Sequence, residues 1–387
     1  MTGRNRPLPS EADVVIIGGG VMGLSSALHL ARAGVRVVLL EKGSLGEGST
    51  SRAAGGVRAV FSDEINIALG LRSLEAFERF EAEFDQPIDL HQVGYLFLLD
   101  NDEQVETFTR NAALQHAMDV DSRMITVEEA ARLSPLIDTT GLKAALWSPR
   151  DGHCTPESVV QGYARAARAA GATIVPGTAA TGLVMEGDTI LAVQTADGAI
   201  SASSVLCAAG AWSREVGAWA GVDLPVEPLR RQIVVTEPMP DLAPDTPFTI
   251  DFASGLYFHG EGRGLLIGMP ESEDSWGFDT AADPGWLTAL AEALERRAPS
   301  VAEVGVRSGW AGLYEMTPDH NALIGRSRRV PGFLYACGFS GHGFLMGPAV
   351  GEVVRDLFLD RSPIIDVSAL DLERFTRADA RPELNIV

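Results

Sequence analysis

The sequence predicts a chain of the α/β class, α+β overall, in which a domain of parallel strands and helices is interleaved with a domain built on an antiparallel sheet. Two observations lead to this expectation. Glycine-rich turns occur near both ends of the chain, at residues 13–23 and 338–344, and each precedes a helical pattern. Between them, segments with helical periodicity are interrupted by several short runs that favour strands.

The N-terminal glycine turn has the complete context of a Rossmann dinucleotide-binding motif. An apolar run of strand length precedes Gly18-x-Gly20-x-x-Gly23, a helix follows, and a second apolar strand ends in Glu41. In this motif Gly18 permits the tight turn, Gly20 lets backbone amides approach a pyrophosphate, and Gly23 lets helix and strand pack closely. The helix N-terminus adds partial positive charge there, and Glu41 is placed to accept hydrogen bonds from ribose hydroxyls.

The remaining elements follow from local signals. Helices are predicted at about 62–84, in two segments after residue 99 of which the second begins at the capping box Thr126-x-x-Glu129, from Thr155-Pro156 to Gly171, and after Asp283-Pro284. Strands are predicted at 94–99, 173–175, 190–195 and 200–206 (a hairpin around Asp197-Gly198), 205–212, 232–236, 256–259 and 265–269. We therefore expect residues 10–90, 150–220 and 310–387 to form the dinucleotide-binding domain, and residues 91–149 and 221–309 to form a substrate-binding domain.

Composition and charge exclude several classes of partner. The chain has 387 residues, of which 46% are hydrophobic, and its 31 basic and 52 acidic side chains give a formal net charge of −21. Such a charge repels nucleic acid and anionic membranes, so neither is expected as a partner. The cysteines Cys154, Cys207 and Cys337 are too few and too scattered for a disulfide framework or a zinc site, which predicts a cytoplasmic protein without a metal.

Several further motifs, in a fixed order, give the chain a resemblance to a known family. They are residues 48–52 (Gly-Ser-Thr-Ser-Arg), 151–152 (Asp-Gly), 207–213 (Cys-Ala-Ala-Gly-Ala-Trp-Ser), 310–319 (Trp-Ala-Gly-Leu-Tyr-Glu-Met-Thr-Pro-Asp) and 338–344. With the N-terminal motif, they make the chain resemble the D-amino-acid-oxidase-like flavoproteins, in particular the sarcosine oxidase and L-proline dehydrogenase β-subunit branch. The resemblance implies a Rossmann-like FAD-binding domain.

The implied activity is the oxidation of an amino acid or secondary amine, proline- or sarcosine-like, at the carbon next to nitrogen by hydride transfer to the flavin. Two alternatives stay open. The chain could be the flavin-bearing subunit of a multi-chain dehydrogenase, or a tailoring oxidase that acts on a bulkier secondary-metabolite amine.

The resemblance also implies which residues hold FAD. They are Gly18, Gly20, Val21, Met22, Gly23, Glu41, Lys42, Ser49, Thr50, Ser51, Arg52, Ala209, Gly210, Gly341, His342, Gly343, Phe344 and Leu345. The residues from Gly341 onward would lie at the pyrimidine end of the flavin, where amides at a helix start stabilise the negative charge that develops on reduction.

The sequence departs from the monomeric sarcosine oxidases at three positions. Gly312 stands where those enzymes carry the cysteine that binds flavin covalently, so non-covalent FAD is expected. Leu266 and Leu345 stand where they carry lysines, one for the reaction with oxygen and one for substrate binding. These losses favour the dehydrogenase or β-subunit type, with a partner subunit or an electron-acceptor protein as a possible partner.

Four residues are expected to meet the substrate. Arg58 aligns with the family's substrate arginine and would bind a carboxylate, although a surface position is the alternative. Tyr257 would cover the pocket, unless it serves in sheet packing, and Tyr314 matches a family tyrosine beside the flavin. His342 is expected to act through its backbone and the shape of its loop rather than as a general base.

Overall fold

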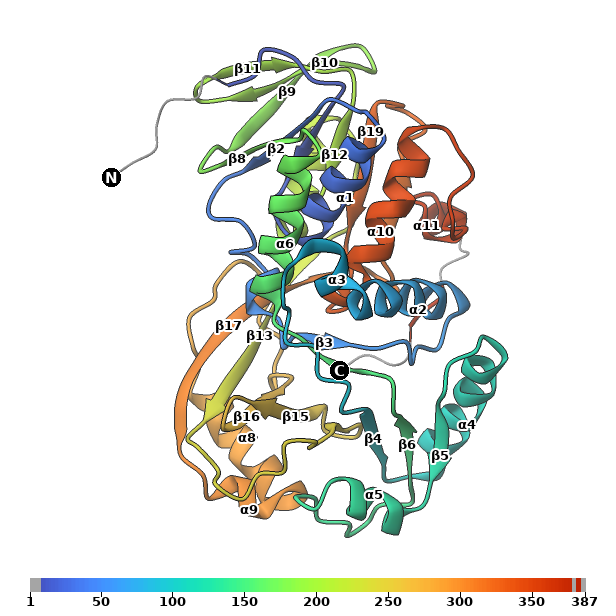
Figure 1. Cartoon of the computed structure of the whole chain (residues 1–387), viewed down its shortest axis with the longest axis vertical. Helices are drawn as coiled ribbons and strands as arrows, with labels where there is room; N and C mark the ends of the chain where they lie inside the picture. Colours follow the sequence, from blue (N-terminus) through green and yellow to red (C-terminus); the bar gives the residue numbers. More distant parts are fainter. Residues whose placement is uncertain (1–7, 378–380, 384–387) are drawn as a thin grey trace.

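The computed structural model describes residues 8–377 and 381–383 of the chain. Its strands form two large sheets, one in each half of the molecule, with helices around both (Figure 1). The half at the top of Figure 1 contains both glycine turns, and the half at the bottom contains the longer sheet. This mixed α/β architecture confirms the predicted fold class.

The six-stranded sheet has the order β18-β19-β12-β1-β2-β8, which places the first strand of the chain near its centre. Strands β19, β12, β1, β2 and β8 are parallel, and β18 is antiparallel at one edge. The strands are β1 (Val14–Ile17), β2 (Val37–Glu41), β8 (Thr173–Pro176), β12 (Val205–Cys207), β18 (Leu323–Arg326) and β19 (Phe333–Cys337). The central strands are apolar throughout because both faces of a parallel sheet are covered.

One face of this sheet packs on helices and the other on a small second sheet (Figure 1). The helices are α1 (Val21–Arg32), α2 (Glu64–Glu78), α3 (Phe80–Phe84), α6 (Pro156–Ala169) and α10 (Gly343–Phe358). The opposite face packs on β9 (Ala180–Glu186), β10 (Thr189–Thr195), β11 (Gly198–Ser201) and α7 (Ser213–Trp219). Alternate residues of β1 therefore belong to two cores, with Val14 and Ile16 on the helical side and Val15 and Ile17 on the other.

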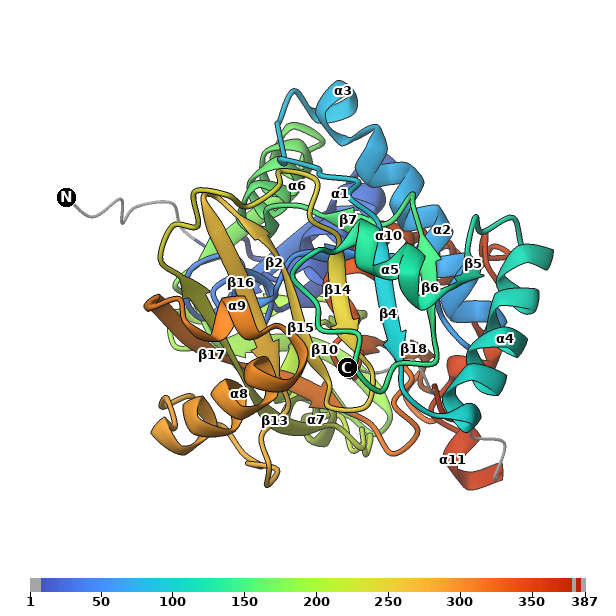
Figure 2. The same ribbon diagram turned by 90° about the horizontal axis from the view of Figure 1, so that it is seen from below.

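The eight-stranded sheet has the order β17-β13-β16-β15-β14-β4-β6-β5 and is antiparallel except where β14 meets β4. Its strands are β4 (Tyr95–Leu99), β5 (Arg123–Ile125), β6 (Ala144–Ser148), β13 (Glu227–Thr236), β14 (Phe248–Asp251), β15 (Leu256–Glu261), β16 (Gly264–Met269) and β17 (Val306–Met316). Helices α4 (Asp102–Ala117), α5 (Val127–Leu133), α8 (Pro284–Arg297) and α9 (Pro299–Ala302) surround it, as the view from below shows (Figure 2).

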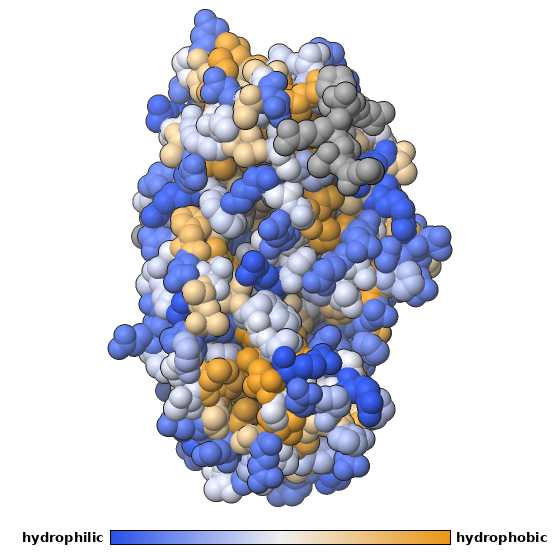
Figure 3. All heavy atoms as spheres, turned by 90° about the vertical axis from the view of Figure 1, so that its left-hand side faces the viewer, coloured by the Kyte–Doolittle hydropathy of each residue, from blue (hydrophilic) through white to orange (hydrophobic). Residues whose placement is uncertain are grey.

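Short elements complete the fold. They are the 3-10 turns η1 (Thr50–Arg52), η2 (Gly210–Trp212) and η3 (Ser368–Leu370), the paired strands β3 (Gly56–Val57) and β7 (Gly152–His153), and helix α11 (Arg374–Arg377). Figure 3 shows the face at the left of Figure 1 as mainly hydrophilic, with an apolar area in its lower half. Within the described part of the chain, no helix has both the length and the apolar composition needed to cross a membrane.

Several local predictions are confirmed. Thr126 accepts a hydrogen bond from the backbone N–H of Glu129 at 3.2 Å and caps α5. The predicted hairpin forms between β10 and β11, with Thr195 paired to Gly198 and the turn at residues 196–197. Asp283 caps α8 by accepting a hydrogen bond from the N–H of Gly285 at 2.9 Å.

Other elements differ from the predictions. The helix expected at 62–84 begins after its cap Asp63 and is interrupted at Arg79, giving α2 and α3. The strand expected at 200–206 is two strands, because β11 belongs to the three-stranded sheet and β12 to the parallel one. Strands β3, β5, β6, β7, β9, β14, β17 and β18 were not predicted. The domain assignment stays a prediction, and its boundary at 309/310 falls inside β17.

Candidate active site

A cavity of about 880 Å³ lies between the two halves of the molecule, and residues from both large sheets line it. One end is formed by the turns that follow β1, β2 and β12, at the carboxyl edge of the parallel sheet. The other end is formed by β13, β14, β15 and β17 of the antiparallel sheet. In doubly wound sheets this carboxyl edge is where ligands bind.

The first glycine turn is built for a close backbone approach. Gly18 has a φ of +116°, which L side chains rarely adopt, and a Cβ on Gly23 would overlap the carbonyl oxygen of Gly18. Helix α1 begins at Val21 after the N-cap residue Gly20, which has no side chain to cap the helix, and the amide of Val21 donates to Thr50 Oγ1 at 3.2 Å. The cavity wall therefore includes the positive end of a helix, which suits phosphate. Gly23 itself does not line the cavity and serves in the packing of α1 on β1.

Glu41 holds this turn in place. Its Oε2 accepts the backbone N–H of Gly19 at 2.7 Å, and its Oε1 accepts that of Gly43 at 2.8 Å. The next residue, Lys42, lies over the ring of Trp212 at 3.1 Å from the centroid, and its burial lowers the pKa of the ammonium. Both side chains line the cavity.

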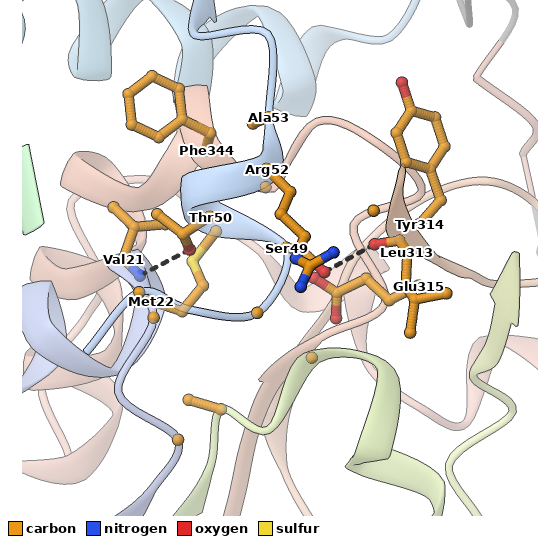
Figure 4. Close-up of a pocket in the computed structure, with 18 of the residues that line it drawn as sticks. Val21, Met22, Ser49, Thr50, Arg52, Ala53, Leu313, Tyr314, Glu315 and Phe344 are labelled. Atoms are coloured by element: carbon orange, nitrogen blue, oxygen red, sulfur yellow. Dashed lines mark hydrogen bonds between the residues drawn. The ribbon is translucent and has the colours of Figure 1, made fainter. Parts of the chain in front are cut away.

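The segment 49–52 is held against β17 by two direct hydrogen bonds, and Figure 4 shows the one from Ser49 to Leu313. Ser49 Oγ donates to the carbonyl of Leu313 at 2.6 Å, and the guanidinium of Arg52 donates to the carbonyl of Ala311 at 2.6 Å. Ser49, Thr50 and Arg52 line the cavity as expected. Ser51 does not; it lines a smaller pocket beside α6.

The second glycine turn brings α10 to the same cavity. Gly341 has a φ of +96° and packs against the ring of Tyr314, where no Cβ would fit. Helix α10 begins at Gly343 after the N-cap residue His342, again without a side-chain cap, and its first residues line the cavity. Ala209, Gly210 and residues 341–345 all lie in the wall.

His342 is a neutral imidazole in this setting. The residue is 7% exposed, and its ring meets that of Phe61 edge-on at 5.2 Å between centroids. Burial, followed by the charge of Arg58, lowers its pKa well below the ordinary range.

Aromatic rings form one wall of the cavity. Tyr95 stacks on Phe248 at 4.3 Å, and Phe248 stacks on Tyr257 at 5.6 Å between centroids. Burial raises the pKa of Tyr95, Tyr257 and Tyr314, so all three keep their hydroxyl protons. Tyr257 thus lines the cavity and also packs within the sheet.

Arg58 lies in the same wall and is not a surface residue. It is 5% exposed, its guanidinium carbon lies 4.3 Å from the centroid of the Phe61 ring, and it donates to the carbonyl of Val60 at 2.6 Å. Asp151 is fully buried and lies close enough to Arg58 for their charges to interact. Burial raises the pKa of the Asp151 carboxyl to about 7, against the lowering effect of Arg58.

Several cavity residues do not follow from any single sequence motif. They include Tyr95, Trp212, Arg231, Phe248, Phe278 and Glu315. Glu315 accepts the N–H of Gly338 at 2.8 Å, and burial raises its pKa to about 7. The available signal for Glu315 was an ionisable residue between the apolar residues Tyr314 and Met316, whereas Arg231 lies in a polar part of β13 that gives no such signal.

Comparisons with known proteins agree with this geometry. A family described as FAD dependent oxidoreductase matches residues 13–357. The chain belongs to this family of FAD-dependent oxidoreductases. The resemblance inferred from the motifs is therefore confirmed, and FAD is the cofactor.

Two curated relatives of this oxidoreductase are mitochondrial dehydrogenases. It is 30% identical over 393 residues to sarcosine dehydrogenase of Mus musculus, covering 96% of this chain and 42% of that protein. It is 32% identical over 394 residues to dimethylglycine dehydrogenase of Rattus norvegicus, covering 95% of this chain and 46% of that protein. The chain thus spans less than half the length of these relatives.

Solved structures match over nearly the whole chain. The L-proline dehydrogenase of P. horikoshii superposes with a TM-score of 0.91 at 34% identity, covering 97% of this chain and all of that one. Glycine oxidase of Geobacillus kaustophilus superposes with a TM-score of 0.84 at 26% identity, covering 94% and 99%.

The residues present fit FAD. Glycine turns that admit no Cβ, two helix starts without side-chain caps, and Glu41 between them provide the surfaces that a dinucleotide requires.

Proposed function

We propose that this oxidoreductase oxidises an amino acid or a secondary amine, proline- or sarcosine-like, at the carbon next to nitrogen. The observation that carries the proposal is Arg58, a guanidinium in the wall of a largely aromatic cavity. A carboxylate is its natural ligand because a planar guanidinium donates two parallel hydrogen bonds to it. The names of the relatives, which include sarcosine, dimethylglycine and L-proline dehydrogenases, support the same substrate class.

Four residues of the cavity have a role in this proposal. Arg58 anchors the substrate carboxylate, which fixes the position of the neighbouring C–H bond. Tyr257 and Tyr314 keep water away from the reacting carbon, and neutral His342 shapes the loop at the start of α10. Bound FAD supplies the oxidant, taking the two electrons and the hydrogen removed from carbon.

The substrate enters the reaction as a neutral amine, since only the lone pair on nitrogen can form the C=N bond of the imine product. The protonated tyrosines and the neutral histidine are uncharged, so these side chains add no charge beside the amine. We further propose that the FAD-binding residues named in the sequence analysis contact the cofactor. FAD is bound non-covalently, because Gly312 offers no thiol for a covalent link.

Anaerobic mixing of the holoprotein with proline, sarcosine, dimethylglycine and glycine tests the proposal through bleaching of the flavin absorbance. Arg58→Ala should weaken substrate binding, measured from the amine concentration dependence of bleaching, by about 2–5 kcal/mol while FAD stays bound. Arg58→Lys should restore part of this binding free energy. Arg307→Ala, at an exposed position of β17, is the matched control. Flavin that no amine bleaches would overturn the proposal.

The electron acceptor is proposed to be a protein or a partner subunit rather than oxygen. Leu266 and Leu345 support this, because they stand where the monomeric sarcosine oxidases that the sequence resembles carry lysines. Slow release of hydrogen peroxide, together with fast turnover with an artificial acceptor, is the expected result. Rapid peroxide release would contradict it.

We also propose a cytoplasmic location, supported by three buried cysteines that form no disulfide.

A further inference from the structure

Arg231 is a second guanidinium in the cavity, on the strand next to the one that carries Tyr314. It lies on β13, where its backbone pairs with Gly312 of β17. Its guanidinium carbon is 5.6 Å from the centroid of the Tyr314 ring. Arg58 and Arg231 both lower the pKa of the Tyr314 hydroxyl against the larger effect of burial, so the two cations share one chamber with it.

The neighbouring Arg230 shows what a fully paired arginine looks like in this strand. Arg230 points the other way, as strand alternation requires, and makes two hydrogen bonds to Glu271 at 2.7 and 2.9 Å. Glu271 is 4% exposed in its side chain, so this pair is structural.

Arg231 is paired much less completely. Its side chain is 17% exposed, and its Nη1 donates to the carbonyl of Arg230 at 3.0 Å and to Asp274 at 3.3 Å. The Nε–H is buried and has no hydrogen-bond partner among the described residues. Asp274 is 47% exposed, so water screens its charge. A buried donor without a partner is costly, and a ligand in the cavity can satisfy it.

The loop that carries Asp274 also borders the cavity. Residues Phe278 and Thr280 of this loop line the wall, and Phe278 stacks on Trp212 at 5.3 Å between centroids. An anionic group that enters beside this loop would meet Arg231.

We propose that Arg231 binds a second carboxylate of the substrate, so that the preferred substrates are secondary amines with one carboxylate on each side of the nitrogen. This inference rests on the proposed function and narrows its substrate class. Arg58 takes the carboxylate next to the carbon that is oxidised, and Arg231 takes the one on the other N-substituent. A monocarboxylic amine engages only one of the two guanidiniums.

A matched pair of amines tests this proposal. N-methylglycine and N-(carboxymethyl)glycine differ only in the carboxylate on the second N-substituent. Anaerobic flavin bleaching against amine concentration should show a lower half-saturating concentration for the dicarboxylate in the wild type. Arg231→Gln should raise that concentration about tenfold to a hundredfold for the dicarboxylate and less than about threefold for N-methylglycine. Arg231→Lys should restore part of the difference.

Two further variants sharpen the result. Asp274→Asn removes the competing acid and should tighten dicarboxylate binding about twofold to fivefold. Arg307→Gln, which removes an exposed arginine of β17, should behave as wild type. FAD content and thermal unfolding of each variant show that it is folded and loaded.

Other outcomes would overturn the inference. An equal loss for both amines in Arg231→Gln would make Arg231 a general carboxylate anchor, and a loss of FAD affinity would make it a cofactor residue. Bleaching by N-methylglycine without a preference for the dicarboxylate would reject the inference and leave the proposed function standing. Absence of bleaching by every amine would reject the proposed function itself.

Discussion

Replacing Glu41 with alanine tests whether one side chain organises the cofactor turn. In the structure its two carboxylate oxygens accept the amides of Gly19 and Gly43 at 2.7 and 2.8 Å. Glu41→Ala removes both hydrogen bonds. Among the described residues, Glu41 is the acceptor for both of these amides. We expect a turn that is less ordered before FAD arrives.

The magnitude follows from the two contacts. A hydrogen bond to a charged group contributes about 1.5–3 kcal/mol, and partial exposure of Glu41 reduces each to about 1 kcal/mol. The two bonds together therefore contribute about 2 kcal/mol to ordering the turn. Their loss in Glu41→Ala should lower the FAD affinity about thirtyfold, within a range of roughly tenfold to hundredfold. Glu41→Gln keeps one carbonyl acceptor and should lose about half of this free energy.

Titration of FAD into the apoprotein, followed by quenching of flavin fluorescence, measures the affinity. Chemical unfolding of the apoprotein adds a second readout, because the two bonds are internal and their loss lowers stability even without FAD. Glu186→Ala, at the exposed end of β9, removes a carboxylate outside the cavity and serves as the control. Wild-type FAD affinity in folded Glu41→Ala would refute the reasoning, and weakened FAD binding with unchanged apoprotein stability would assign the acid to the ribose alone.

Three further changes have defined outcomes. Gly23→Ala should destabilise the protein by about 1–3 kcal/mol in urea unfolding, because the new Cβ overlaps the carbonyl of Gly18; unchanged stability would contradict the close packing. Arg374→Ala should cost about 3–5 kcal/mol by leaving Asp319 buried without its bidentate partner, and a loss under 1 kcal/mol would count against this. Burial raises the pKa of Asp151 from 3.8 to about 7, so the native state holds a proton that the unfolded chain has released. The free energy of unfolding should therefore fall by about 2–4 kcal/mol as pH rises from about 4 to about 7, and Asp151→Asn should flatten that part of the curve; an identical slope in the variant would exclude Asp151 as its source.

The parts of the fold that depend on local signals were predictable. The turn at Gly18 and Gly20, the cap Thr126 and the hairpin at Gly198 each require particular residues at adjacent positions, so the sequence alone reveals them. The break of the helix at Arg79 was not predictable, since the apolar periodicity continues through it and tertiary packing decides where the helix bends.

The site was predictable where one motif supplies it and not where two distant strands meet. Tyr314 belongs to a motif that the family resemblance covers, and Arg58 follows another such motif closely in the sequence. Arg231 enters the chamber only because β13 pairs with β17, and Phe248 only because the four-residue β14 is inserted beside β4. Such pairings depend on contacts between residues far apart in the chain, which periodicity does not encode.

The central position of β1 has a consequence for biosynthesis. This strand leaves the ribosome early, yet one of its two neighbours, β12, is made much later, and α10, which packs on α1, is made near the end. Until then one edge of β1 and an apolar face of α1 have no native partner, so the nascent chain exposes surfaces that promote aggregation. High contact order of this kind slows folding, and we expect the growing chain to depend on chaperones until α10 has emerged.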